Sequence, residues 1–337
     1  MAPNTLVLVA TLAVLAVGTH VAAFLLVPIA SGGDPIRFEI AERESLASVA
    51  ARLARDGVIH NRFEFVLLGR VTGRDRRLQA GEYALQPSMR PLEILDHFWR
   101  GTVVLHPVTI PEGYTVRQIA DAFGAAGIGD PDALLGLAES PEFARELGVE
   151  APTLEGYLFP DTYALPRRIA SADILRRMVE RFREVYQAEW ASRAADMGLT
   201  QHQVVTLASI IEKETGAGHE RPTISAVFHN RLRMRMPLQS DPTVIYPIKN
   251  FDGNLRKVDL IRDTPYNTYR RRGLPPGPIA NPGRDALEAA LYPAGVDYLF
   301  FVARNDGTHQ FSRTLREHNR AVNEFQRRGR RAASQGA

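Results

Sequence analysis

The first part of the chain is dominated by apolar positions. Residues 5–30 contain no formally charged side chain. As a helix, this stretch would be about 39 Å long, which exceeds the roughly 30 Å of hydrocarbon in a bilayer. A cleaved signal peptide would have a shorter apolar run, and Ala30-Ser31-Gly32 is only a weak cleavage site. The pattern therefore predicts an uncleaved membrane anchor and linker over residues 1–33.

Residues 34–130 carry short strand and helix patterns instead. Residues 36–40 alternate as a strand, and Ser45 precedes a helix with a 3.6-residue apolar period that ends at Gly57. The pattern returns 70 positions later, with Ile110, Thr115 and Gly127 in the places of Ile40, Ser45 and Gly57. Further helices are expected over 63–71 and 91–100, and a strand over 81–85. This internal repeat predicts one or two small α+β modules.

Such small strand-and-helix units resemble LysM-type modules. In that family they bind the N-acetylglucosamine backbone of cell-wall glycans. A structural spacer or a protein-docking domain fits the same pattern. The sequence leaves these alternatives open for residues 34–130.

Residues 131–326 are predicted to form a second, mainly helical domain. Ser171 is expected to cap a helix that continues through Trp190. Thr200 and Gln203 form a capping box that begins a helix ending at Glu214. Residues 298–304 and 308–313 flank Asn305-Asp306-Gly307, which is a strong hairpin signal. A helix over 317–327 and a basic flexible tail over 327–337 complete the chain.

Composition and charge exclude several classes of function. The formal net charge of +3 depends on four arginines of the tail, and no basic stripe elsewhere indicates nucleic-acid binding. The chain has no cysteine, which removes disulfides, thiolate metal sites and cysteine nucleophiles. His219-Glu220-Arg221-Pro222 lacks the second histidine of a zinc-protease motif, and its proline would break the required helix. We expect neither a metal nor a cofactor.

Glu212 is the first candidate for chemistry. On a helical wheel of residues 201–214 it falls inside the apolar arc near Val205 and Ala208, whereas Lys213 points away. A carboxyl group desolvated in this way can retain a proton at neutral pH and act as a general acid. An ordinary charged helix end explains Glu212, Lys213 and Glu214 equally well. The wheel also does not separate Glu214 from Glu212.

Proline-rich loops downstream of this helix supply groups that suit a carbohydrate cleft. Tyr246, Tyr266 and Tyr269 offer stacking faces, and Gln239 and Asn267 offer hydrogen bonds. Asp241 also has a purely structural interpretation, since Asp241-Pro242 is a normal helix N-cap followed by proline at the first helical position.

Five ordered blocks in residues 150–320 have a recognisable pattern. They are Leu154-Glu155-Gly156-Tyr157-Leu158-Phe159-Pro160-Asp161-Thr162-Tyr163; Ala208-Ser209-Ile210-Ile211-Glu212-Lys213-Glu214; Val227-Phe228-His229-Asn230-Arg231-Leu232 with Pro237-Leu238-Gln239-Ser240-Asp241-Pro242-Thr243-Val244-Ile245-Tyr246; Tyr266-Asn267-Thr268-Tyr269 with Gly273-Leu274-Pro275-Pro276-Gly277-Pro278; and Asp306-Gly307-Thr308-His309-Gln310-Phe311. Together these blocks closely resemble the endolytic murein transglycosylase family (MltG, or YceG-like).

The resemblance implies an α+β protein with an N-terminal transmembrane helix, LysM-like modules and a lysozyme-like catalytic domain. It implies an endolytic lytic transglycosylase that cuts nascent peptidoglycan strands and leaves 1,6-anhydro-N-acetylmuramic acid ends. The implied location is the inner membrane, single-pass, with the catalytic domain in the periplasm. Peptidoglycan synthases are candidate protein partners. A non-catalytic protein that binds the cell wall remains the alternative.

The resemblance also assigns site residues. The glutamate of its second block is catalytic in that family, which carries over to Glu212 as general acid and base. Seven further residues fall in blocks expected around the cleft and are candidate substrate-binding residues: Glu155, Ser209, Gln239, Asp241, Tyr246, Asn267 and Tyr269.

Overall fold

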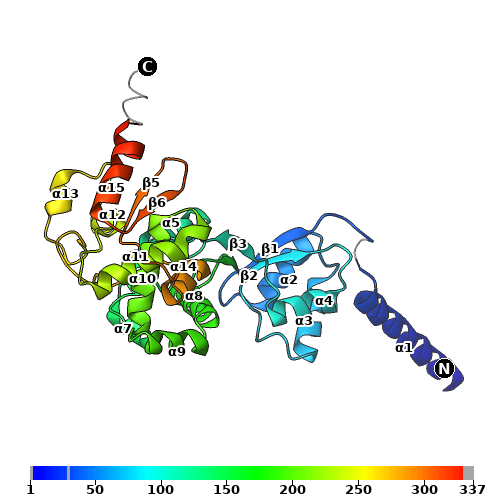
Figure 1. The fold of residues 1–337 in the computed structure, drawn as a ribbon. Helices are drawn as coiled ribbons and strands as arrows, with labels where there is room; N and C mark the ends of the chain where they lie inside the picture. The colour runs from blue at the N-terminus through cyan, green and yellow to red at the C-terminus, as the bar shows by residue number, and fades with distance from the viewer. Residues whose placement is uncertain (1–2, 29–30, 329–337) are drawn as a thin grey trace, which may run out of the picture. The chain divides into compact units, whose positions relative to one another are not determined.

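The computed structural model describes residues 3–28 and 31–328, and it divides the chain into two compact units of mixed helix and strand (Figure 1). The first unit comprises Met1–Pro107 and Ala164–Arg168, and the second comprises Val108–Tyr163 and Ile169–Ala337. The α+β class expected from the sequence is therefore confirmed. The predicted basic tail lies, from residue 329 onward, outside the described residues.

The chain begins with a long apolar helix, α1 (Pro3–Leu26). Its segment Val7–Leu26 is long and apolar enough to cross a membrane, and none of that segment is buried. A helix so exposed and so apolar is unsuited to water. The structure thus contains the N-terminal apolar helix that the sequence predicts.

The first unit pairs a two-stranded sheet with three helices. Strand β1 (Ile36–Ile40) runs antiparallel to β2 (Gly81–Leu85), with Phe38 opposite Tyr83. The helices are α2 (Leu46–Arg55), α3 (Arg62–Val71) and α4 (Pro91–Arg100). The side chain of Ser45 accepts a hydrogen bond from the Ser48 N–H and so begins α2 as predicted. Alternate residues of both strands face one apolar core beneath the helices.

The second copy of the internal repeat belongs to the other unit. Its strand is β3 (His106–Thr109), and the boundary between the two units falls within this strand, after Pro107. Its helix is α5 (Val116–Ala125), which packs on α6 (Pro131–Ala138). The contact boundary therefore lies after Pro107, whereas the sequence placed it after residue 130. The apolar face of α5 explains the difference, because it is buried within the second unit rather than the first.

The second unit is mainly helical, in agreement with the sequence. In addition to α5 and α6 it contains these elements: α7 (Pro141–Glu146), β4 (Thr162–Leu165, shared with the first unit), α8 (Ser171–Val185), α9 (Ala188–Asp196), α10 (Gln201–Glu214), η1 (Gly218–Glu220), α11 (Arg221–Arg233), α12 (Asp241–Ile245), α13 (Lys257–Ile261), α14 (Arg284–Leu291), β5 (Phe300–Ala303), β6 (His309–Ser312), α15 (Leu315–Val322) and η2 (Asn323–Arg328). The predicted hairpin is confirmed, since β5 and β6 pair antiparallel across residues 305–307.

The helix expected from Ser171 to Trp190 is instead two helices. The residue before the helix is Ala170, and α8 ends where Tyr186 leaves helical geometry with ψ of 78°. The Tyr186 ring then stacks on Phe182 at 5.6 Å and meets the edge of Trp190 at 5.9 Å. Packing of these three rings is a tertiary effect that helical periodicity does not report.

Helix α10 is the central element of the second unit. It begins with the predicted capping box of Thr200 and Gln203, and every residue from Val204 to Ile211 is buried. Helices α14 and α11 pack against it (Figure 1). The polar residues at its C-terminal end are thereby held on a rigid, fully packed support.

We predict that Gly156→Ala destabilises the second unit by about 2–4 kcal/mol. Gly156 has a φ of +87°, and an added Cβ would lie 2.5 Å from Pro278 and 2.7 Å from Val205. Gly198→Ala is the matched control, because Gly198 has a φ of +68° with nothing within 4 Å. It should lose only about 1–2 kcal/mol, the cost of the left-handed backbone. Chemical denaturation measures both, and equal losses would contradict the predicted clash.

Candidate active site

Glu212 lies in a polar cluster at the C-terminal end of α10. Its side chain is only 6% exposed. Arg221 Nη2 donates to Glu212 Oε1 at 3.0 Å, and the Gly283 N–H donates to Glu212 Oε2 at 3.0 Å. The helical wheel predicts that this carboxyl group lies among apolar side chains. The structure shows instead that both of its oxygens have polar partners, contributed by α11 and by the start of α14.

Arg221 gathers three carboxylates around one guanidinium group. In addition to Glu212, its nitrogens lie 3.6 Å from Glu112 Oε2 and 3.7 Å from Asp285 Oδ2. Its side chain is 11% exposed, and its buried Nε has no hydrogen-bond partner among the described residues. The carboxylates come from α10, α14 and the loop before α5. A single cation therefore joins three segments that are far apart in the sequence.

Glu112 is the carboxylate that the sequence reasoning missed. Burial raises its pKa, the negative charges of Glu212 and Asp285 raise it further, and Arg221 opposes them. Its carboxyl group lies against the backbone of Gly283, where an added Cβ would be 1.9 Å from Glu112 Oε1. The internal repeat predicts the helix that follows this segment, but it gives no role to the carboxyl group of Glu112. Sequence spacing carries no signal that residues 112 and 212 meet.

Glu155 occupies a separate buried position. The Val116 N–H donates to Glu155 Oε1 at 3.1 Å, Asn281 Nδ2 donates to the same oxygen at 2.9 Å, and the Tyr246 hydroxyl donates to Oε2 at 3.1 Å. Burial nevertheless raises the pKa of Glu155 to about 8. Two of the expected site residues, Glu155 and Tyr246, are thus in direct contact.

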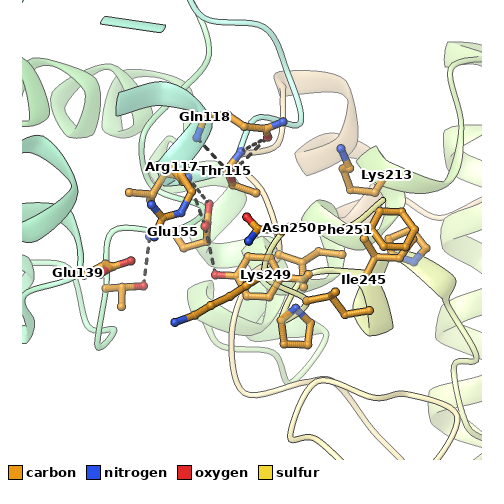
Figure 2. Close-up of a pocket in the computed structure, with 17 residues that line it drawn as sticks. Thr115, Arg117, Gln118, Glu139, Glu155, Lys213, Ile245, Lys249, Asn250 and Phe251 are labelled. Atoms are coloured by element: carbon orange, nitrogen blue, oxygen red, sulfur yellow. Dashed lines mark hydrogen bonds between the residues drawn. The ribbon is translucent and has the colours of Figure 1, made fainter. Parts of the chain in front are cut away.

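A cavity of about 1060 Å³ opens beside this carboxyl group. Arg117 and Glu139 lie on one side of it and Lys213 on the other in the view of Figure 2. Seventeen residues line it: Thr115, Val116, Arg117, Gln118, Glu139, Thr153, Glu155, Lys213, Pro242, Ile245, Tyr246, Pro247, Ile248, Lys249, Asn250, Phe251 and Ile279. Its volume and its mixture of aromatic, amide and charged groups suit a polar organic ligand.

The cavity and the Glu212 cluster meet at Gly113. An added Cβ on Gly113 would lie 3.5 Å from Glu212 Cγ and 3.4 Å from Lys213 Cδ, and Lys213 Nζ donates to the Gly113 carbonyl at 3.2 Å. Glu212 and Lys213 are adjacent on α10, and of the two Lys213 lines the cavity. The candidate acid is therefore one residue away from the lining of the cavity.

Glu214 is the other acid of the same motif, and its surroundings differ from those of Glu212. Ser240 Oγ donates to Glu214 Oε1, and burial raises the pKa of Glu214 to about 7. This is the desolvated setting that the helical wheel assigned to Glu212. Because the Glu214 carboxyl group is buried and bonded to Ser240, the residue before α12, its contacts indicate that it holds the end of α10 to the start of α12.

The remaining expected residues bind other parts of the protein. Asp241 is the first residue of α12 rather than its cap, and its carboxylate accepts the Tyr269 hydroxyl at 2.6 Å. Ser209 is fully buried and accepts the Ile279 N–H at 3.0 Å. The Asn267 amide donates to the carbonyls of Leu260 and Arg262, while Gln239 is exposed with a φ of +52°. None of these residues contacts the Glu212 carboxyl group among the hydrogen bonds of the described chain.

No group of three or more His, Asp or Glu side chains in residues 3–28 and 31–328 is arranged to hold a metal ion. The side chains that do meet around Glu212 are three carboxyl groups and one guanidinium group, and carboxyl groups in such a setting can transfer protons.

We predict that Glu155 makes the protein less stable as the pH rises. Its folded pKa of about 8 exceeds the ordinary value of 4.5, so the folded state binds more protons between these values. The stabilising contribution of the neutral carboxyl group is complete below 4.5 and is lost as the pH rises through 8. Melting temperatures across this range should fall less steeply for Glu155→Gln than for the wild type.

Glu139→Gln is the control for this prediction, because Glu139 is an exposed carboxyl group on the same cavity. It should retain most of the wild-type slope, because the negative charge of Glu139 raises the pKa of Glu155 much less than burial does. Some slope should also persist in Glu155→Gln, since the raised pKa of Glu214 acts in the same direction. Parallel curves for the wild type and Glu155→Gln would show that Glu155 is ionised in the folded protein at neutral pH.

Comparisons with known proteins agree with the resemblance seen in the motifs. The YceG-like family matches residues 38–324. The chain is 33% identical over 309 residues to the endolytic murein transglycosylase of Bacillus subtilis (strain 168), covering 86% of this chain and 84% of that protein. It is 31% identical over 280 residues to the endolytic murein transglycosylase of Streptococcus pneumoniae serotype 2 (strain D39), covering 73% of this chain and 50% of the relative.

A solved structure supports the same assignment. The crystal structure of a putative yceG-like protein from Listeria monocytogenes is similar with a TM-score of 0.60 and 35% sequence identity. The similarity covers 85% of this chain and 98% of that one. By both its sequence and its fold, the chain belongs to the YceG-like family.

Proposed function

We propose that Glu212 is the general acid and base of this chain, which acts as an endolytic murein transglycosylase, a lyase that cuts peptidoglycan strands internally. The observation that carries the proposal is the position of Glu212. It is an almost buried carboxyl group at the end of a rigid helix, held on both oxygens, and its neighbour Lys213 lines a large cavity. The names of the relatives, which match most of this chain, supply the substrate class.

The reaction needs one proton to leave a carboxyl group and return to it. Glu212 protonates the oxygen of the bond between N-acetylmuramic acid and N-acetylglucosamine as that bond breaks. The C6 hydroxyl of the muramic acid then attacks its own C1, and its proton passes to Glu212. The products are two shorter strands: one ends in 1,6-anhydro-N-acetylmuramic acid, and the other carries the freed hydroxyl of N-acetylglucosamine. No water is consumed, and Glu212 regains its proton.

The Arg221 cluster supports both halves of this cycle. When Glu212 gives up its proton, Arg221 and the Gly283 N–H stabilise the carboxylate that forms. With all three carboxylates ionised, however, one cation would face three negative charges. Repulsion among like charges favours a proton within the cluster. Stabilisation of the carboxylate by Arg221 and Gly283 therefore favours proton release, and repulsion among the three carboxylates favours proton recovery.

Glu112 must be considered as a second carboxylate. A hydrolytic glycosidase uses two carboxyl groups, one as an acid and one to activate water or attack the sugar. Glu112 and Glu212 lie near the same guanidinium nitrogen, Arg221 Nη2. Identification of the products thus decides between intramolecular transfer and hydrolysis, and Glu112 is the partner that hydrolysis would require.

For the first unit we propose a glycan-binding role of the LysM type. Its small sheet and three helices enclose their own core, which supports an independent module. For the second unit we propose a lysozyme-like mode of catalysis, with an acid presented at the end of a buried helix. We further propose that α1 anchors the chain as a single pass, with both units on the outer face of the membrane, where peptidoglycan synthases are candidate partners.

The first test of this function replaces each of the two acids of the α10 motif, separately, by glutamine. Glu212→Gln keeps the shape of the side chain but cannot donate and recover a proton, and we expect cleavage of purified murein strands to fall by about 10² to 10⁴. Glu214→Gln should retain most of the activity, because Glu214 contacts Ser240 inside the protein. Strand lengths after digestion measure both variants. A larger loss in Glu214→Gln would assign the acid to Glu214 instead.

The second test identifies the products. Digestion in water enriched in oxygen-18 should give 1,6-anhydro ends that are lighter by one water and carry no label. Mass analysis of the released fragments measures both properties. Reducing ends that carry the heavy oxygen would show a hydrolase and would point to Glu112. Unchanged strand lengths, with the protein bound to murein, would show a cell-wall-binding protein without catalysis.

A further inference from the structure

Helix α3 of the first unit has apolar side chains on two faces. Phe65 and Gly69 are buried in the core of the unit. Phe63, Leu67 and Val71 are 70%, 60% and 78% exposed. Their spacing of four residues places them on one narrow stripe of the helix surface. We call these three residues the outer stripe.

Several exposed arginines lie on α3 or close to it in the sequence. Arg62 and Arg70 are exposed on α3 itself, and Arg76 and Arg77 are exposed in the segment that follows it. The Arg62 guanidinium lies 4.6 Å from the centre of the Phe63 ring. An apolar stripe flanked by arginines is typical of a helix that lies in a membrane interface, where the apolar side chains enter the lipid and the cations meet phosphate groups.

The connection to α1 keeps this surface close to the membrane. Only residues 27–35 separate α1 from β1, and fully extended they would span about 30 Å. Within this unit, His20 Nε2 of α1 lies 2.7 Å from Glu64 Oε1 of α3, and Phe24 packs against the core. The first turn of α3 therefore lies beside the last two turns of the apolar helix.

We propose that α3 docks on the surface of an anionic phospholipid bilayer, with Phe63, Leu67 and Val71 in the lipid and the neighbouring arginines at the headgroups. The proposal rests on the membrane anchoring assigned to α1, and it does not depend on the catalytic activity. Docking would fix the orientation of the first unit at the membrane instead of leaving it to move freely on its linker.

The absence of cysteine in the chain allows a direct test. Leu67→Cys introduces one thiol on the outer stripe. Ala84→Cys is the control, since Ala84 is exposed on β2 between two residues that face the core. Each full-length variant is labelled with a small fluorophore and reconstituted in vesicles of phosphatidylcholine and phosphatidylglycerol. Quenching is measured with spin-labelled lipid and with aqueous iodide.

We expect the label at residue 67 to be quenched several-fold more by the lipid probe than the label at residue 84, and several-fold less by iodide. Replacing Arg70, Arg76 and Arg77 together by Gln should reduce the lipid quenching at residue 67 towards the level in pure phosphatidylcholine. Equal quenching at residues 67 and 84 in the otherwise unchanged chain would overturn the proposal. It would indicate that the stripe faces water or awaits a protein.

Extraction with alkaline carbonate separates this proposal from the anchor. Release of the protein would overturn both the anchor and the docking. Retention of the protein with residue 67 open to iodide would overturn the docking alone. Murein digestion is not used in any arm, so failure of the proposed catalytic function leaves this result readable.

Discussion

The structure around the candidate active site depends on one buried cation. Arg221 is held between three carboxylates from a loop, from α10 and from the start of α14. Removing one member of a buried ion pair leaves an uncompensated charge, which usually costs about 3–5 kcal/mol. The three acidic segments would also repel each other without the guanidinium group. The position of Glu212 is therefore a property of the whole cluster, and the same arrangement that orders these segments sets the charge around the candidate acid.

A second buried carboxyl group, that of Glu155, joins loop segments of the second unit in a similar way. Glu155 is buried, and it accepts hydrogen bonds from the start of α5, from Tyr246 and from the turn at Asn281. Asn281 in turn accepts the Leu158 N–H through its side-chain oxygen. Each buried polar atom in this network has a partner, as an unpaired one would be costly. The loops that line the cavity are thus positioned by specific polar contacts more than by sheet or helix pairing.

Local signals in the sequence predicted much of this fold, and contacts between distant segments account for what they missed. Ser45, the Thr200 and Gln203 box, and the Asn305-Asp306-Gly307 turn act within a few residues, and the structure confirms all three. Periodicity also predicted a buried α10. It did not report that Glu112 reaches the Glu212 cluster, that ring packing at Tyr186 divides a helix, or that α5 joins the second unit. Helical phase describes which face of a helix is apolar, but not which segment covers that face.

For helix α3, too, the apolar pattern predicts the helix but not what covers its faces. The sequence predicted a helix over residues 63–71, yet the pattern could not say that only one of its two apolar faces is covered by the first unit. A surface helix that is apolar on both sides needs a second apolar environment. In the arrangement that we propose, this environment is the membrane that α1 is suited to cross, and α1 ends a few residues before the first unit begins. In that arrangement the anchor and the outer stripe would act together, because a tether restricts distance whereas a docked helix also restricts orientation.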